Sequence, residues 1–276
     1  MSQAWSRYWA RDTSGACLPD APQVVQQRLI DAWTALGREL TVETRLLDIA
    51  SGGGSVLRVL RERSMATALT GIDAADVGPA AALVGVKGGV DAHSLPFAEA
   101  SFDVVTSQFG IEYCQARAWT EAVRVLRPGG QVQFICHHAR SHAVLHNARR
   151  LAALRAVVNA GLFTLAEAVA RTGHEDHRLV AAVMAARQAH ADQPVASELP
   201  SALGQWARVR RIDAVMSIRA EAEAEIERLT AMQSAALDHA DLTTRLAWLA
   251  PLAPEVEVLD DPAGTPIAWL VRARRP

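Results

Sequence analysis

The sequence predicts an α/β fold, a doubly wound and mostly parallel sheet with a C-terminal antiparallel hairpin and a helical insertion. Three observations predict it. Short apolar runs alternate with helix-like patterns across the first half of the chain, as parallel strands and their crossover helices require. The first of these runs ends in a glycine-rich turn. After a long helical block, residues 255–271 return to strand-like alternation around Asp260–Gly264, which predicts the hairpin.

The first strand and the turn after it give the strongest local signal. In RLLDIASGGGSVL, residues 45–57, an apolar run ends at a serine and three glycines, and apolar residues at helical spacing follow. Glycine tolerates positive φ and carries no Cβ, so such a turn lets the backbone approach a ligand. The next helix offers unpaired N–H groups and the positive end of its dipole. The pattern therefore predicts a ligand-binding turn, although such turns also occur as plain corners.

Further strands are expected near residues 68–73, 86–90, 102–107 and 130–136. The first of them ends at Asp73, which lies 21 residues after Gly52. At this spacing, nucleotide-binding α/β folds place an acidic residue that accepts hydrogen bonds from ribose hydroxyls. Taken alone, Asp73 could equally be an ordinary helix N-cap. The sequence Arg127–Gly130 predicts a turn before the last parallel strand.

Five motifs occur in a fixed order: DIASGGG, GIDAAD, VDAHSLPF, SFDVVTSQFG and VLRPGGQV. In order and spacing they resemble class I S-adenosylmethionine-dependent methyltransferases, of the UbiE-like type with small-molecule substrates, over residues 45–136. The resemblance implies a seven-stranded Rossmann-like methyltransferase fold with S-adenosyl-L-methionine as its cofactor. One position departs from the pattern, because Ala50 stands where the family usually has glycine.

The resemblance also implies which residues lie under the amino acid and sugar portions of the cofactor. Asp48, Gly52 and Gly54 are expected to form this loop, and Ala50 and Ser51 to contribute through their backbone. In isolation, Asp48 could also simply cap the turn.

The remaining cofactor contacts are implied at the ends of the next strands. Asp73 is expected to bind the ribose hydroxyls, with Ile72 packed nearby. Asp91 is expected to accept a hydrogen bond from the adenine amino group, beside Ala92. Ser107–Gln108 is expected to line the gap between the cofactor and the acceptor.

His137 and His138 are the candidate catalytic residues. They follow the fifth strand at the end of the sheet where the acceptor is expected, and histidine is the usual proton acceptor near neutral pH. The alternative is that both are partly exposed loop residues. Glu112 and Tyr113 could touch substrate or cofactor, or Glu112 could only favour a helix dipole.

The composition indicates which classes of binding partner to expect. The chain has 276 residues, 50% hydrophobic content, a net charge of −2 and a pI of about 6.5, so nothing drives it electrostatically toward nucleic acid. Three cysteines without metal-type spacing, and no signal-like or 18-residue apolar segment, predict a cytoplasmic protein with no membrane partner. No metal is expected, because the carboxylates that metal-dependent relatives place near the fourth strand are missing.

Two domains are predicted. Residues 1–140 and 251–276 form the cofactor-binding domain, and residues 141–250 form a helical insertion with one long helix over about 205–237. Breaks are expected at Asn159–Gly161, Thr172–His174, Gln193–Pro194 and Leu199–Pro200. The insertion is either a cap over the acceptor or an oligomerisation element, which makes a homodimer a candidate assembly.

The expected function is methyl transfer to a small organic acceptor by in-line displacement. Two alternatives stay open from the sequence. One is a non-catalytic cofactor-binding or assembly protein of the same fold, and the other is an S-adenosylmethionine-dependent enzyme that does not transfer a methyl group.

Overall fold

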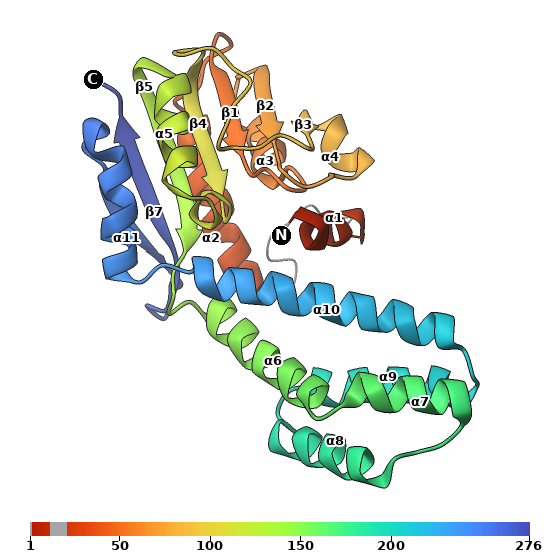
Figure 1. Cartoon of the computed structure of the whole chain (residues 1–276). Helices are drawn as coiled ribbons and strands as arrows, with labels where there is room; N and C mark the ends of the chain where they lie inside the picture. Colours follow the sequence, from red (N-terminus) through yellow and green to blue (C-terminus); the bar gives the residue numbers. More distant parts are fainter. Residues whose placement is uncertain (1, 12–20) are drawn as a thin grey trace. The chain divides into compact units, whose positions relative to one another are not determined.

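The computed structural model describes residues 2–11 and 21–276 (Figure 1). It confirms the predicted fold class: one seven-stranded sheet in the order β3-β2-β1-β4-β5-β7-β6. The first five strands pair in parallel, and β7 pairs antiparallel to both β5 and β6. The strands are β1 (Arg45–Ile49), β2 (Ala68–Ile72), β3 (Val86–Lys87), β4 (Phe102–Gln108), β5 (Leu126–His137), β6 (Glu255–Asp260) and β7 (Pro266–Arg274).

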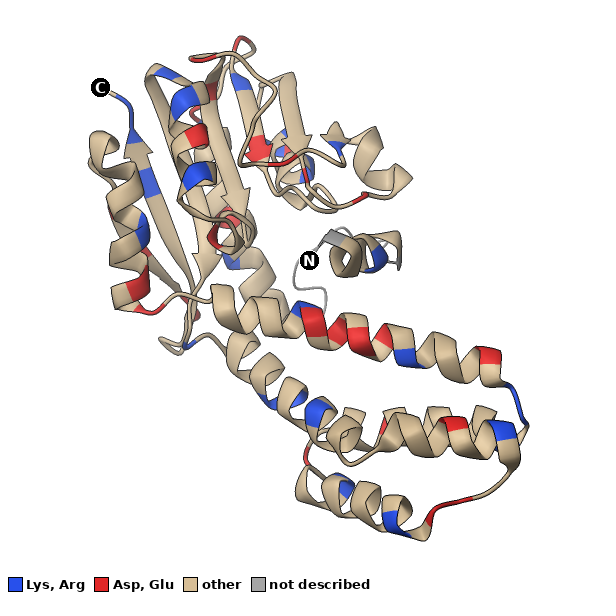
Figure 2. Cartoon of the chain, in the orientation of Figure 1, with Lys and Arg blue, Asp and Glu red and all other residues tan. Residues whose placement is uncertain are grey.

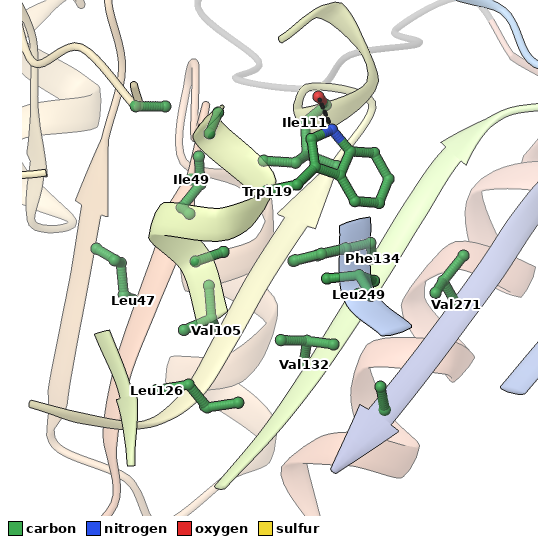
Figure 3. Close-up of a cluster of buried hydrophobic side chains, with 14 of the residues drawn as sticks. Leu47, Ile49, Val105, Ile111, Trp119, Leu126, Val132, Phe134, Leu249 and Val271 are labelled. Carbon is green, nitrogen blue, oxygen red and sulfur yellow. Dashed lines mark hydrogen bonds between the residues drawn. The ribbon is translucent and has the colours of Figure 1, made fainter. Parts of the chain in front are cut away.

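Alternating residues of the central strands face two separate hydrophobic layers. Leu47 packs with one layer and Leu46 with the other, as the two-residue repeat of a strand requires. On the Leu47 side lie α5 (Ala116–Val125), α11 (His239–Leu246) and η2 (Ala247–Leu252). On the other side lie α2 (Gln23–Gly37) and α3 (Ser55–Arg63). Figure 3 shows the first layer, with the Trp119 ring beside Phe134 at its centre.

The chain forms two compact units, Met1–Val144 with Ser234–Pro276, and Leu145–Gln233. The second unit is shorter than the block predicted over residues 141–250. The difference has a physical cause, because the apolar residues Leu242, Leu249 and Leu252 of α11 and η2 belong to the core of the sheet. Residues 234–250 therefore fold with the sheet unit.

The turn sequence Arg127–Gly130 lies inside β5 rather than before it. Phe102 pairs with Leu126 and Val104 already pairs with Gln131, so the four residues form an irregularity in the ladder between β4 and β5. Gly129 has φ of 74° there, which glycine adopts without strain. The backbone therefore makes a local irregularity at the predicted turn, but β5 continues on both sides of it.

The helical unit contains three complete helices, α7 (Leu162–Thr172), α8 (His177–Ala189) and α9 (Val195–Arg208). It also contains α6 (His142–Asn159) from Leu145 onward and α10 (Ile212–Ala235) up to Gln233. Three predicted breaks are confirmed, near Gly161, Gly173 and Pro194. Pro200, in contrast, lies inside α9. The predicted helix over 205–237 is wrong as one element, because Arg210 has φ of 61° and separates α9 from α10.

Charged side chains in this unit pair with one another. Arg150 of α6 bonds Glu225 of α10 at 2.6 Å, and Arg219 bridges Glu167 at 2.5 Å and Glu223 at 2.9 Å. Figure 2 shows the acidic and basic positions along these helices. Among the described residues, no single helix is long and apolar enough to cross a membrane; α6 and α7 meet that criterion only together, as a pair bent by 47°.

Candidate cofactor and acceptor site

The sheet reverses its order between β1 and β4. From β1 the chain order runs outward through β2 and β3 on one side, and from β4 through β5 on the other. In doubly wound sheets a crevice opens at the carboxyl ends of the two strands that flank such a reversal. Asp48 and Ile49 end β1, and Ser107–Gln108 ends β4, so the predicted site residues meet at this point.

The glycine loop after β1 adopts the left-handed conformations that the sequence predicts. Gly52 has φ of 50°, and Gly54, with φ of 83°, is the N-cap of α3. Ala50 also has a left-handed φ of 53°, which costs an alanine about 1 kcal/mol more than a glycine. Its methyl group finds room because residue 110 is glycine: a Cβ at Gly110 would lie 2.5 Å from the Ala50 Cβ.

Asp48 stabilises this loop through hydrogen bonds of its buried side chain. Its side chain is fully buried, and its two carboxylate oxygens accept hydrogen bonds from the hydroxyls of Ser51 and Thr106, the latter at 2.8 Å. Burial raises the pKa of Asp48 to about 6, against the lowering effect of the two hydroxyls. Through its bond to Ser51, which opens the turn, Asp48 holds the loop in shape.

Asp73 connects the loop to β2. Its Oδ2 accepts a hydrogen bond from the Gly52 N–H and its Oδ1 one from the Ala75 N–H, both at 2.8 Å. Burial raises the pKa of this carboxyl, and the two N–H donors lower it. A carboxylate oxygen can accept a second hydrogen bond, so each oxygen keeps capacity for a hydroxyl donor. Ile72, the residue before it, is buried in the sheet core.

Asp91 follows β3 and has an exposed side chain. It accepts hydrogen bonds from the His93 N–H at 2.9 Å and pairs with the His93 ring Nδ1 at 2.7 Å. These bonds to His93 hold the pKa of Asp91 below its ordinary value. Ala92 is buried between them. This geometry keeps a charged, accessible acceptor on the loop after β3.

Ser107 and Gln108 are both buried and both bonded within the chain. The Ser107 hydroxyl donates to the Ile49 carbonyl at 2.8 Å and accepts from the Ile111 N–H at 3.0 Å. The Gln108 carbonyl oxygen accepts from the Trp33 indole at 2.6 Å. These bonds fix the end of β4 against β1 and α2.

The two candidate catalytic histidines lie in different surroundings. The His137 ring is buried, stacks on Phe109 with 4.4 Å between centroids, and meets Tyr113 edge-on at 5.9 Å. Burial lowers the pKa of His137 to about 3. The His138 ring stacks on Trp269 at 4.4 Å, and its Nδ1 accepts from the backbone N–H of Arg140. Burial, then the Arg140 charge, lowers its pKa as well.

Glu112 is a buried carboxyl near the end of β4. It lies in η1 (Ile111–Tyr113), directly after β4, and is 1% exposed. Its Oε1 accepts from the His137 N–H at 2.8 Å, whereas its Oε2 is buried with no hydrogen-bond partner among the described residues. Burial raises the pKa of Glu112 to about 7. The sequence singles out Glu112 by its place after β4, but no pattern in it reveals the burial.

The helix α1 (Ser2–Arg11) lies against the same end of the sheet. A Cβ placed on Gly52 would come within 2.2 Å of the Trp9 ring, so that ring rests directly on the glycine loop. The Ser6 hydroxyl accepts from the Asp76 N–H at 2.9 Å, and Trp5 meets Tyr113 edge-on at 5.6 Å. These contacts reach the segments that follow β1, β2 and β4.

The residues present fit an adenosyl cofactor. The Asp73 carboxylate is fixed by two N–H groups while it keeps lone pairs for hydroxyls. The missing side chains at Gly52 and Gly54 make room for the Trp9 ring and for Val84, so the fit rests on Asp73. No cluster of three or more His, Cys, Asp or Glu side chains suited to a metal ion occurs in the described ranges.

A methyltransferase-domain family model matches residues 47–134, which include the glycine loop, Asp73, Asp91 and the end of β4. Together with the fold and the site geometry, this match identifies residues 47–134 as a methyltransferase domain of the class I S-adenosylmethionine-dependent type. S-adenosyl-L-methionine is the cofactor of this class.

Two curated relatives are similar to a part of this chain. A demethylmenaquinone methyltransferase of Thermotoga maritima is 33% identical over 109 residues, 36% of this chain and 48% of the relative. The ubiquinone/menaquinone biosynthesis C-methyltransferase UbiE of Methylobacterium nodulans is 37% identical over 115 residues, 37% of this chain and 45% of the relative. The matched segments thus span about half the length of these relatives.

Among solved structures, an S-adenosylmethionine-dependent methyltransferase from Mesorhizobium loti is similar with a TM-score of 0.45 and 16% identity. That similarity covers 89% of this chain and 96% of the other.

Proposed function

We propose that this protein transfers a methyl group from S-adenosylmethionine to a small aromatic acceptor of the quinol type. The observation that carries the proposal is the convergence of the glycine loop, Asp73 and the end of β4 at the reversal of the sheet. The names of the two curated relatives, both quinone methyltransferases, support the acceptor class. The aromatic rings of Phe109, His137 and Tyr113 beside the crevice suit a flat apolar molecule.

The chemistry of this site asks little of the protein beyond orientation and exclusion of water. The cofactor supplies a reactive methyl carbon when bound. Asp73 would hold the ribose hydroxyls and Asp91 the adenine amino group, while Asp48 keeps the loop in shape. His137 and His138 would lie on the acceptor side. Holding the acceptor in line with the carbon–sulfur bond then provides most of the acceleration.

A two-part experiment tests this function. Calorimetry with S-adenosylhomocysteine measures cofactor binding, and transfer of a labelled methyl group from S-adenosylmethionine to 1,4-naphthoquinol under anaerobic conditions measures catalysis. We expect both. Binding without transfer to the naphthoquinol, or to a wider set of phenols, would favour a non-catalytic or non-methylating role. Absence of binding would contradict the function as a whole.

The helical unit has two candidate roles, a cap that selects the acceptor and an oligomerisation arm. We propose the cap, because the inserted block leaves the sheet unit just after β5, the strand that ends at the acceptor side. We expect S-adenosylhomocysteine together with 2-naphthol to slow hydrogen exchange of amides in residues 145–233. Slower exchange only in the sheet unit, together with a dimer by light scattering that dissociates when residues 145–233 are replaced by a short linker, would favour the arm.

A further inference from the structure

Glu112 Oε2 is a buried side-chain oxygen that has no hydrogen-bond partner among the residues that the structure describes. The other buried carboxylate at this end of the sheet, Asp48, has both oxygens bonded. A buried polar atom without a partner destabilises the folded chain by about 1–3 kcal/mol, so a group of this kind calls for a physical reason. The place of Glu112 suggests a ligand.

Glu112 is held firmly on one side. It follows β4 in η1, whose first N–H, that of Ile111, donates to Ser107 at 3.0 Å. Its Oε1 is fixed by the His137 N–H of β5 at 2.8 Å. The carboxyl therefore lies at the carboxyl end of β4, one of the two strands that flank the reversal of the sheet, and its Oε2 makes no hydrogen bond among the described residues.

The surroundings of Glu112 are aromatic and contain few charges. His137 stacks on Phe109, Tyr113 meets His137 edge-on, and Trp5 of α1 meets Tyr113 edge-on. The titratable groups that act on the carboxyl are Cys136 of β5, whose thiol contacts it, Cys114 after η1, and Arg245 of α11, whose positive charge favours the ionised form. The backbone N–H groups of His137, Gly110 and Glu112 favour the ionised form as well. A planar apolar molecule suits these walls, and its one acidic proton would meet the free oxygen.

We infer that Glu112 is a catalytic residue, and that its free oxygen receives the hydroxyl proton of an aromatic acceptor during methyl transfer. This inference rests on the proposed function. Because Glu112 is 1% exposed, an acceptor reaches the oxygen only when neighbouring side chains move; the Trp5 ring of α1, edge-on to Tyr113 at 5.6 Å, lies beside η1.

The step balances as follows. The hydroxyl proton passes to the Glu112 carboxylate, which becomes a neutral acid, and the electron pair of the O–H bond remains on the acceptor. The acceptor oxygen, or the ring carbon beside it, forms the new bond to the methyl carbon. The pair of the broken carbon–sulfur bond stays on sulfur, giving a neutral thioether. When a ring carbon is methylated, its hydrogen leaves as a proton to solvent.

Glu112 is a stronger base than the His137 ring, as a role in proton transfer requires. A proton acceptor works best when its pKa lies near the working pH. The pKa of Glu112 is raised to about 7, whereas the pKa of His137 is lowered to about 3. His137 is therefore a weak base, and its ring serves better as a wall of the acceptor site.

The first test needs no turnover. Calorimetry would compare the binding of 2-naphthol to the S-adenosylhomocysteine complexes of the wild type, Glu112→Gln and Glu62→Gln. Glu62, on α3, has an exposed side chain and provides the same loss of charge away from the site. We expect Glu112→Gln to bind 2-naphthol about tenfold or more weakly, because a hydrogen bond to a charged oxygen is lost. We expect Glu62→Gln to bind like the wild type.

The matched ligand 2-methoxynaphthalene, which lacks the hydroxyl, should show no difference between the wild type and Glu112→Gln. Equal binding of 2-naphthol by the two proteins, or no binding by the wild-type complex, would overturn the inference. Affinity for S-adenosylhomocysteine is measured in the same experiment, so loss of the proposed function would be visible separately.

The second test uses the pH profile of methyl transfer to 1,4-naphthoquinol. Glu112 accepts a proton only when ionised, so the wild-type rate should fall as pH falls through about 7. Glu112→Gln should lower the rate about 100- to 10,000-fold and remove this limb. His137→Asn should keep the limb. A limb that persists in Glu112→Gln and vanishes in His137→Asn would assign the proton transfer to the histidine instead.

Discussion

Asp73→Ala is expected to weaken binding of S-adenosylmethionine about tenfold or more. The carboxylate can accept the two ribose hydroxyls, and hydrogen bonds to a charged group contribute about 1.5–3 kcal/mol. The variant also removes the partner of the Gly52 N–H, so the glycine loop loses its connection to β2. Calorimetry with S-adenosylhomocysteine measures the loss without any need for an acceptor.

Asp76→Ala is the matched control for this variant. Asp76 lies three residues further along the same loop, and its side chain is exposed. It removes one negative charge from nearly the same place, so a purely electrostatic effect would appear in both variants. We expect Asp76→Ala to bind the cofactor like the wild type. Wild-type affinity in Asp73→Ala would show that this carboxylate does not hold the ribose.

The sheet is predictable from the sequence because its signals are local. The apolar run of β1 and the glycines after it predict a strand, a turn and the start of a helix within a dozen residues. Arg210 shows where local signals fail. Its left-handed φ of 61° ends the predicted long helix, and its guanidinium donates to the carbonyls of Arg171 and Thr172 at the end of α7. A contact across 38 residues leaves no local trace in the sequence.

The site, too, has residues that the local sequence reveals and residues whose properties depend on tertiary packing. Asp73 is visible because its spacing from the glycine loop is a property of the chain, and the structure gives it the clamped geometry that its predicted role needs. The ordinary pKa values of glutamate and histidine make His137 a better base than Glu112 at neutral pH. Burial reverses that order, and burial follows from tertiary packing.

Trp119→Ala is expected to lower the free energy of unfolding of the sheet unit by about 3–5 kcal/mol. Trp119 is completely buried, and its ring meets Phe134 and Trp248 edge-on at 5.5 and 5.9 Å. Truncation leaves a large cavity in the layer that Figure 3 shows. Urea unfolding followed by circular dichroism measures the change, and stabilisation by S-adenosylhomocysteine identifies the transition of the sheet unit.

Trp206→Ala is the control, because Trp206 is 38% exposed in the helical unit. It should change the same transition by less than about 0.5 kcal/mol. A loss below about 1 kcal/mol in Trp119→Ala would contradict the packing described for this layer.

Trp119→Phe links this core to the site. The variant keeps most of the apolar ring but removes the indole N–H that donates to the Ile111 carbonyl at 3.1 Å, the bond drawn in Figure 3. Ile111 opens η1 and precedes Glu112. A buried carbonyl left without its donor destabilises by about 1–3 kcal/mol, and the turn that presents Glu112 loses one of its two anchors. We therefore expect Trp119→Phe to weaken 2-naphthol binding, while S-adenosylhomocysteine, whose proposed contacts lie on the loops after β1 and β2, binds unchanged.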